Sequence, residues 1–143
     1  MIQLSDAHQL SFTVPAGKGV PDLFPESPLF TALPPVFATG FTVGLMEWCC
    51  IDHLRVAEHH TDDDISLGIG INITHDAPCT EGTTLDVTCT CVDVGKKSVT
   101  WDVVVKAGDI IMAQGQHKRA IVNREQFTTH VNSIATKVGG RQI

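Results

Sequence analysis

Apolar and polar residues alternate with a period of two along much of the chain. Five stretches show this pattern, the first of them weakly: 9–14, 67–74, 84–91, 98–105 and 110–122. Such alternation is typical of strands in a sheet with one covered face and one wetter face. The connections between the last three stretches are short enough for antiparallel hairpins. The pattern predicts an antiparallel sheet of about five strands.

Helical patterns occupy other parts of the chain. One long helix is expected from residue 39 or 40 to between residues 56 and 58, with apolar residues on every side, and such a helix is normally buried. A proline-rich stretch precedes it, in which Ser27-Pro28 predicts one short helix within a lid or wrapping loop. Near the end, Asn123 and Gln126 resemble a capping box before residues with helical spacing.

These elements define an architecture. A long apolar helix and a sheet with one apolar face must cover each other. We therefore expect an α+β protein with a hotdog fold, in which a sheet of about five strands wraps a long central helix and a C-terminal helix follows. The length of 143 residues fits a single domain, 1–143. Because such a sheet leaves an edge for a second copy, we expect a homodimer.

Composition narrows the function. Ten basic and sixteen acidic residues give a net charge of −6, which argues against a nucleic-acid partner. No apolar run approaches the roughly 20 residues that span a bilayer, and the start lacks the features of a signal peptide, so we expect no membrane association. The five cysteines resemble small core residues in a reducing compartment, which predicts a cytoplasmic protein.

Glu47 is the residue that most needs explanation. It lies in the middle of the predicted long helix, among apolar neighbours such as Met46 and Trp48. An ionised glutamate in such a setting is costly unless it is paired, hydrogen-bonded or protonated. No partner lies nearby in the sequence, and buried carboxylates of this kind are candidates for chemistry. A structural ion pair across a dimer interface is the alternative.

Two further residues are expected near Glu47. His75 shares its parity with Leu67, Ile69, Ile71 and Ile73, so it is predicted to face the long helix. An imidazole and a carboxylate brought together from distant positions are typical of acid/base chemistry. Thr39 precedes the helix, where free N–H groups stabilise negative charge on oxygen. The simpler interpretations are an N-cap for Thr39 and a hydrogen-bonded structural histidine for His75.

Other motifs carry less weight. Gly40, Gly68 and Gly70 would let a ligand approach the backbone. The histidines and aspartates of 59–64 are expected to be a solvated loop, and Cys89-x-Cys91 lacks a second pair at zinc spacing, so we predict no metal site. No nucleotide or cofactor fingerprint is present, and no cofactor is expected.

Several segments resemble the fluoroacetyl-CoA thioesterases of the hotdog superfamily. The match runs over about residues 8 to 130 and is carried by 23–28, the block Phe37-Ala-Thr-Gly-Phe to Met46-Glu-Trp, Ser66-Leu-Gly, Thr74-His75 and His117-x-Arg119-Ala. The resemblance implies an acyl-CoA thioesterase that hydrolyses a short-chain acyl-CoA, of the fluoroacetyl-like kind, to the free acid and CoA.

The resemblance also implies residue roles. Thr39, Glu47 and His75 stand at the family's three catalytic positions, and Gly68 stands where the backbone approaches the acyl group. Phe30 falls in the lid, and Leu33 replaces a second aromatic gate, which puts fluorine selectivity in question. The substrate contacts are therefore expected at Gly40, Gly68, Phe30, Leu33, Phe37 and Arg119, and Arg119 is also a candidate for the CoA phosphates.

Two other functions stay open at this point. A hotdog enoyl-CoA hydratase or dehydratase would use the same carboxylate and imidazole to move a proton and a water across a double bond. A non-catalytic acyl-CoA-binding module would retain them only as an interface pair. A shared fold does not decide among the three.

Overall fold

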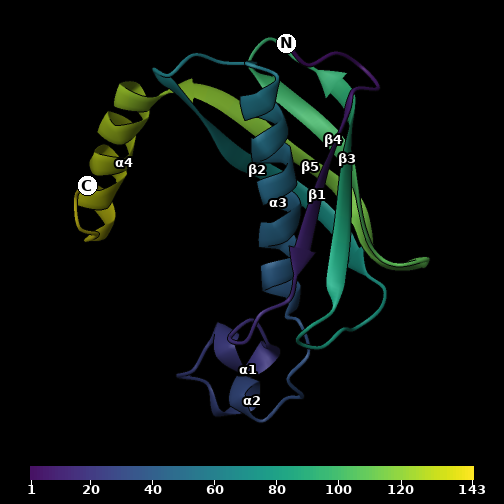
Figure 1. Cartoon of the computed structure of the whole chain (residues 1–143). Coiled ribbons are helices and arrows are strands. Elements are labelled where there is room, and N and C mark those ends of the chain that lie inside the picture. Colours follow the sequence, from purple (N-terminus) through teal and green to yellow (C-terminus); the bar gives the residue numbers. More distant parts are fainter.

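The computed structural model describes all residues from 1 to 143 and contains the predicted elements (Figure 1). In chain order they are β1 (Ala7–Thr13), α1 (Val20–Leu23), α2 (Pro28–Thr31), α3 (Thr39–Val56), β2 (Asp64–His75), β3 (Thr84–Val94), β4 (Ser98–Ala107), β5 (Ile110–Asn123) and α4 (Arg124–Val138). The long helix and the last three strands lie where the periodicity predicts them, whereas β1 and β2 begin two to three residues earlier.

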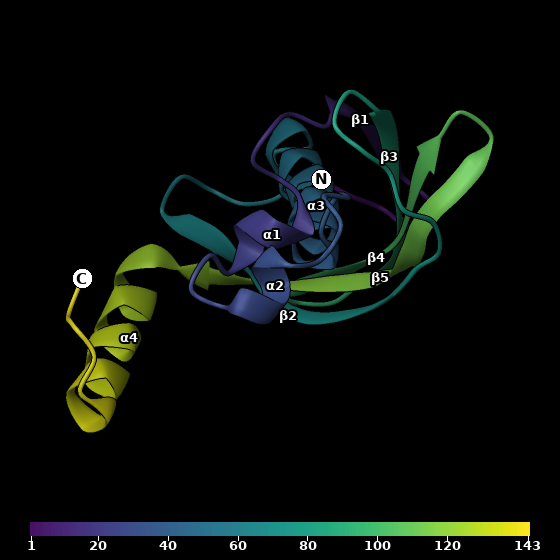
Figure 2. The same cartoon turned by 90° about the horizontal axis from the view of Figure 1, so that it is seen from below.

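The five strands form one antiparallel sheet in the order β1-β3-β4-β5-β2. Figures 1 and 2 show the sheet curving around α3, which lies against its concave face. The strands β1 and β2 are the two edges, so the groups on their outer sides have no partner strand within the chain. This arrangement is the predicted α+β hotdog fold.

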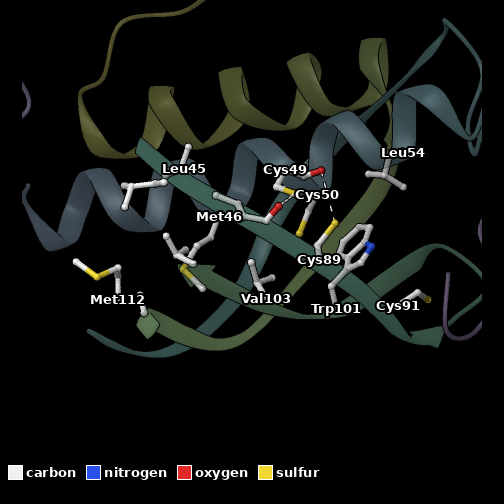
Figure 3. Packing of buried hydrophobic residues seen from close by; sticks show 14 of the residues in the cluster. Leu45, Met46, Cys49, Cys50, Leu54, Cys89, Cys91, Trp101, Val103 and Met112 are labelled. Atoms are coloured by element: carbon white, nitrogen blue, oxygen red, sulfur yellow. Dashed lines mark hydrogen bonds between the residues drawn. The ribbon is translucent and has the colours of Figure 1, made fainter. Parts of the chain in front are cut away.

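The core lies mainly between α3 and the strands β3 and β4. Alternate residues of β3 and β4 are fully buried and point at α3, as the period-two pattern requires (Figure 3). They pack against Leu45, Met46, Cys49 and Cys50 of the helix. Each buried Val, Leu or Met side chain contributes about 1.5–3 kcal/mol when it leaves water. All five cysteines are free and buried, so they act as small core residues.

A buried histidine interrupts this apolar core. The Nδ1 atom of His53, on α3, accepts a hydrogen bond of 3.0 Å from the Nε1–H of Trp101. Its ring stacks on His8, which in turn contacts the carboxylate of Asp52 at 3.1 Å. Burial lowers the pKa of His53, because the charged imidazolium would lose its hydration there. His53 therefore holds Trp101 in place as a neutral acceptor.

The sequence predicts that the long helix is buried on every side, and this prediction is wrong for α3. The sheet covers the face that carries Met46 and Cys50, whereas Trp48 is 47% exposed and Ile51 is 41% exposed on another face. A helix can be apolar all round and still have only one covered face, since periodicity reports the residues and not their neighbours.

The expected single face of β2 is also wrong. Its pairing with β5 shifts between Gly68, opposite Arg119, and Gly70, opposite Lys118, so Ile69 is an extra, bulged residue. Side chains on the two sides of the bulge therefore follow different parity. Gly68 faces α3 before the bulge and His75 faces it afterwards, while Leu67 turns to the other face of the sheet.

The last helix lies apart from the body of the protein. Asn123 is its N-cap, since its side-chain oxygen accepts a 3.0 Å hydrogen bond from the N–H of Gln126 as predicted. The helix α4 contacts mainly β5 and projects away beyond the edge strand β2 (Figures 1 and 2). None of the helices combines the length and apolar character needed to cross a lipid bilayer.

Candidate active site

Thr39 and His75 meet at the first turn of α3. Ala38 is the N-cap residue and makes no side-chain cap, so Thr39 is the first helical residue. Its hydroxyl oxygen lies 2.8 Å from Nδ1 of His75, the last residue of β2. The hydroxyl is therefore committed to the imidazole and not to capping, and these two predicted residues do come together.

The surroundings of this pair suit acyl transfer. A hollow of about 220 Å³ borders both side chains and is also lined by Phe37 and Asp76. The first backbone N–H groups of a helix have no partner within the helix and point outward at its start. A hydroxyl bonded to an imidazole, beside free N–H donors, combines a nucleophile, a base and a place for an oxyanion.

Glu47 has a partner that the sequence did not reveal. Its Oε2 lies 2.9 Å from Nη1 of Arg119 on β5, and its side chain is 36% exposed. Glu47 is therefore half-buried and ion-paired, so the expectation of a fully buried carboxylate is wrong, and its partner belongs to the same chain instead of lying across a dimer interface.

Arg119 is fixed by several acceptors. It donates hydrogen bonds of 2.9 Å to both the hydroxyl and the carbonyl oxygen of Ser66, and one of 3.1 Å to Nε2 of His117. Nδ1 of His117 lies 2.9 Å from the carbonyl oxygen of Gly70, so the ring proton is on Nδ1 and Nε2 accepts from Arg119. Burial lowers the pKa of His117, which fits a neutral ring beside a guanidinium.

Glycine is required beneath Glu47. A Cβ atom at Gly68 would lie 2.9 Å from Oε2 of Glu47 and 3.4 Å from Nη1 of Arg119. The absence of a side chain leaves a hollow of about 340 Å³ beside Glu47, lined also by Gly70, Ile71 and His117. The β2 bulge brings Gly68 to this position, so the bulge and the ion pair form one unit.

The two groups do not meet within one chain. Thr39 and Glu47 are eight residues apart on α3, which is about 12 Å along a helix axis. They border different hollows, and neither Thr39 nor His75 makes a hydrogen bond to Glu47. The structure therefore pairs Thr39 with His75 but does not bring Glu47 to them.

Comparison with known proteins identifies the family. The family model described as fluoroacetyl-CoA-specific thioesterase matches residues 25–125. A fluoroacetyl-CoA thioesterase from Streptantibioticus cattleyicolor is 40% identical over 120 residues, which are 84% of this chain and 85% of that protein. The chain belongs to the fluoroacetyl-CoA thioesterase family. The predicted enzyme class, an acyl-CoA thioesterase, is confirmed with it.

Solved structures agree with this assignment to the thioesterase family. A fluoroacetyl-CoA thioesterase structure superposes with a TM-score of 0.88 at 36% identity, covering 93% of this chain and 97% of that one. A variant of such an enzyme, solved in complex with fluoroacetate and CoA, gives a TM-score of 0.84 at 37% identity and covers 88% of this chain and 99% of that one. The hotdog fold is thereby confirmed.

The remaining predicted residues of this family member lie around the start of α3. The helices α1 and α2 sit at that end (Figure 1), where Phe30 packs on Phe24 with ring centroids 5.4 Å apart. Leu33 follows α2 and is 50% exposed. Gly40 lies under Leu23, whose Cδ2 would be 3.1 Å from an added Cβ. Phe37 is buried beside the hollow of Thr39 and His75.

Arg119 differs from its expected role in CoA binding. Only 5% of the residue is exposed and its guanidinium faces Glu47, so this placement does not support a contact with solvated phosphates. Sequence reasoning also missed Ser66 and His117 as the residues that hold Arg119. The alternation along β5 was the available signal, because it places His117 and Arg119 on one face. No three His, Cys, Asp or Glu side chains come together to hold a metal ion.

Proposed function

We propose that this chain hydrolyses a short-chain acyl-CoA with Thr39 as the nucleophile and His75 as its base. The observation that carries the proposal is the 2.8 Å contact between the Thr39 hydroxyl and Nδ1 of His75. Nucleophile and base within hydrogen-bond reach are the usual signature of covalent acyl transfer. Membership of the family supports a thioester as the substrate, and the contact supports Thr39 and His75 as the reacting residues.

The reaction then takes two steps. Thr39 Oγ1 attacks the thioester carbonyl carbon while Nδ1 of His75 takes its proton, and the N–H groups at the start of α3 stabilise the oxyanion. The imidazolium returns the proton to the departing CoA sulfur, which leaves an acyl ester on Thr39. A water molecule, deprotonated by Nδ1 of His75, attacks the ester carbonyl carbon. The bond from that carbon to Thr39 Oγ1 breaks, the imidazolium returns its proton to Oγ1, and the acid is released. Each proton and each bond is thereby accounted for.

This mechanism gives Glu47 a different role from the one that the sequence predicted. The sequence suggested Glu47 as nucleophile or base, but within one chain it borders a different hollow from His75 and is paired with Arg119. We propose that Glu47 acts in the site of a second protomer, which completes a homodimer. The free edge of β2 supports this arrangement, because antiparallel pairing of two β2 strands about their centre brings the His75 end of one strand towards the Ser66–Gly68 end of the other.

Mixing two inactive variants tests the shared site. Thr39→Ala and Glu47→Gln chains are each expected to be impaired alone. In a mixed dimer, one of the two sites then has both native residues, so random mixing restores about one quarter of wild-type sites. If all catalytic residues came from one chain, the mixture would stay at the level of its parents. Sedimentation of the mixture shows that dimers have formed.

The acyl group remains part of the proposal. A relative in the family was solved with fluoroacetate and CoA, and the half-exposed Leu33 lies at the lid of this chain. An aliphatic side chain there makes the lid less aromatic than the gate expected for fluoroacetyl selectivity. We therefore propose that short unfluorinated acyl groups are accepted too, and that Leu33→Phe shifts preference towards fluoroacetyl-CoA.

The rival functions make different products. A hydratase or dehydratase leaves the thioester intact, and a binding module turns nothing over, whereas a thioesterase releases free CoA thiol. The Thr39–His75 contact favours the thioesterase, because a hydratase needs no nucleophile. We also propose a cytoplasmic location, since five free buried thiols suit a reducing compartment.

A pair of conservative variants tests the nucleophile. Thr39→Ser keeps the hydroxyl and is expected to retain thiol release, whereas Thr39→Ala removes it and is expected to lose about 10²-fold or more in kcat. Mass spectrometry of rapidly quenched wild-type protein should show an acyl adduct on Thr39. Equal kcat for Thr39→Ala and wild type would overturn the assignment.

A further inference from the structure

An aromatic hollow lies on the side of α3 that faces β1. Its walls are Phe12, Phe41 and Trp48, and its volume is about 200 Å³. The rings of Phe12 and Trp48 meet edge to face with centroids 6.0 Å apart, so the walls are packed against each other. This hollow is separate from the one beside Glu47, because Trp48 and Glu47 point to opposite edges of the sheet.

The floor of the hollow is a glycine that packing does not require. An added Cβ at Gly44 would meet no atom within 4 Å, and the residue lies in the middle of α3. Glycine is among the poorest residues for a helix interior, and alanine would fit there without contact. Neither a turn nor close packing requires glycine at position 44. A larger side chain there would fill the open space above the helix backbone, so we connect this glycine with that space.

A cation stands at the rim. Nζ of Lys18 lies 4.8 Å from the centroid of the Phe41 ring, and Lys18 makes no ion pair with any carboxylate. An unpaired ammonium beside three aromatic walls offers one contact for a negative group and several for a flat apolar ring. The chain as a whole carries a charge of −6, so this cation is a local departure from its surroundings.

We propose that this hollow binds a small aromatic carboxylate, with the ring between Phe41 and Trp48 and the carboxylate on Lys18. The volume fits a single ring with a short substituent. The hollow borders Phe37, which also lines the hollow of Thr39 and His75, so a bound ring lies one side chain away from the proposed catalytic pair. The ligand site is distinct from that pair.

Fluorescence of Trp48 gives a direct test. The chain has two tryptophans, and only Trp48 is exposed, since Trp101 is fully buried. Phenylacetate is expected to change the emission saturably, its neutral isostere phenylacetamide to bind several-fold more weakly, and acetate to have no effect. The change should disappear in Trp48→Phe, which assigns it to the hollow.

Matched variants separate the ring contact from the charge. Gly44→Leu fills the hollow and should weaken phenylacetate binding at least tenfold, whereas Gly44→Ala, with the same fold by circular dichroism, should weaken it far less. Lys18→Gln should remove the preference for phenylacetate over phenylacetamide. Binding that survives Gly44→Leu, or no saturable change with phenylacetate, would overturn the proposal.

The same fluorescence measurements also test two alternative occupants of the hollow. CoA carries an anionic group and a ring of its own, so a change with CoA but not with phenylacetate would assign the hollow to adenine and refute an aromatic carboxylate. A second copy of the chain is the other occupant. A red shift of Trp48 emission on dilution, in step with dissociation measured by sedimentation, would show that another protomer covers the hollow, and the proposal would be wrong.

Discussion

Replacing Arg119 by methionine tests whether the ion pair with Glu47 holds β2 and β5 to α3. Arg119 donates four hydrogen bonds, two to Ser66 and one each to His117 and Glu47, and methionine keeps the unbranched apolar stem but none of these donors. Breaking a buried ion pair by removing one partner usually destabilises a protein by about 3–5 kcal/mol. Because the Glu47 side chain is 36% exposed, water compensates part of this loss, and we expect about 3 kcal/mol.

Urea unfolding at fixed protein concentration measures this loss. With a urea m-value of about 2 kcal/mol/M, the midpoint of Arg119→Met should fall by about 1.5 M. Lys118→Met is the matched control, because the same chemical change is made one residue away, where the side chain is exposed and unpaired. The free energy of unfolding of this control should change by less than about 0.5 kcal/mol. Equal midpoints for the two variants would refute the structural role of Arg119.

Three other predictions concern the buried histidines and the glycines at positions 68 and 44. Burial lowers the pKa values of His53 and His117, so as the pH falls the unfolded chain binds protons at these residues before the folded chain does. The urea midpoint should therefore be constant above about pH 7.5 and fall as the pH drops below about 6.5. A midpoint that is unchanged down to about pH 5.5 would contradict this. Gly68→Ala should displace Glu47 and lower kcat by about 10²-fold, whereas Gly70→Ala, whose nearest contact would be 3.8 Å away, should leave kcat near wild type. Gly44→Ala should raise the free energy of unfolding by about 0.4–1 kcal/mol, and a loss of stability would show that the space is needed by the fold itself.

Local patterns in the sequence predicted most of the fold. The long helix, the last three strands (β3, β4 and β5) and the cap at Asn123 each rest on short-range periodicity or capping, and the structure shows them at those places. The places of Thr39 at the helix start and of His75 at the end of a strand, facing the helix, were also predicted, because each is fixed by its own element, whereas their hydrogen bond was not predicted.

Long-range pairing explains what the sequence did not show. Leu67 to Ile73 alternate without a break, yet the pairing of β2 with β5 inserts a bulge at Ile69 and reverses the faces before it. The partner of Glu47 lies 72 residues away, so no local pattern indicates it. The exposed face of α3 has the same cause, since an apolar helix face does not reveal what covers it.

Thiol release is the most direct test of the central claim that Thr39 and His75 hydrolyse an acyl-CoA. Acetyl-, fluoroacetyl-, propionyl- and phenylacetyl-CoA are offered to the wild-type protein and to His75→Ala, and free CoA is followed with a thiol reagent. Loss of a positioned base predicts wild-type hydrolysis of at least one ester and a kcat lower by about 10²–10⁴-fold in the variant, with the fold unchanged by circular dichroism. Equal rates of thiol release by the two proteins, or no release from any ester, would contradict the account.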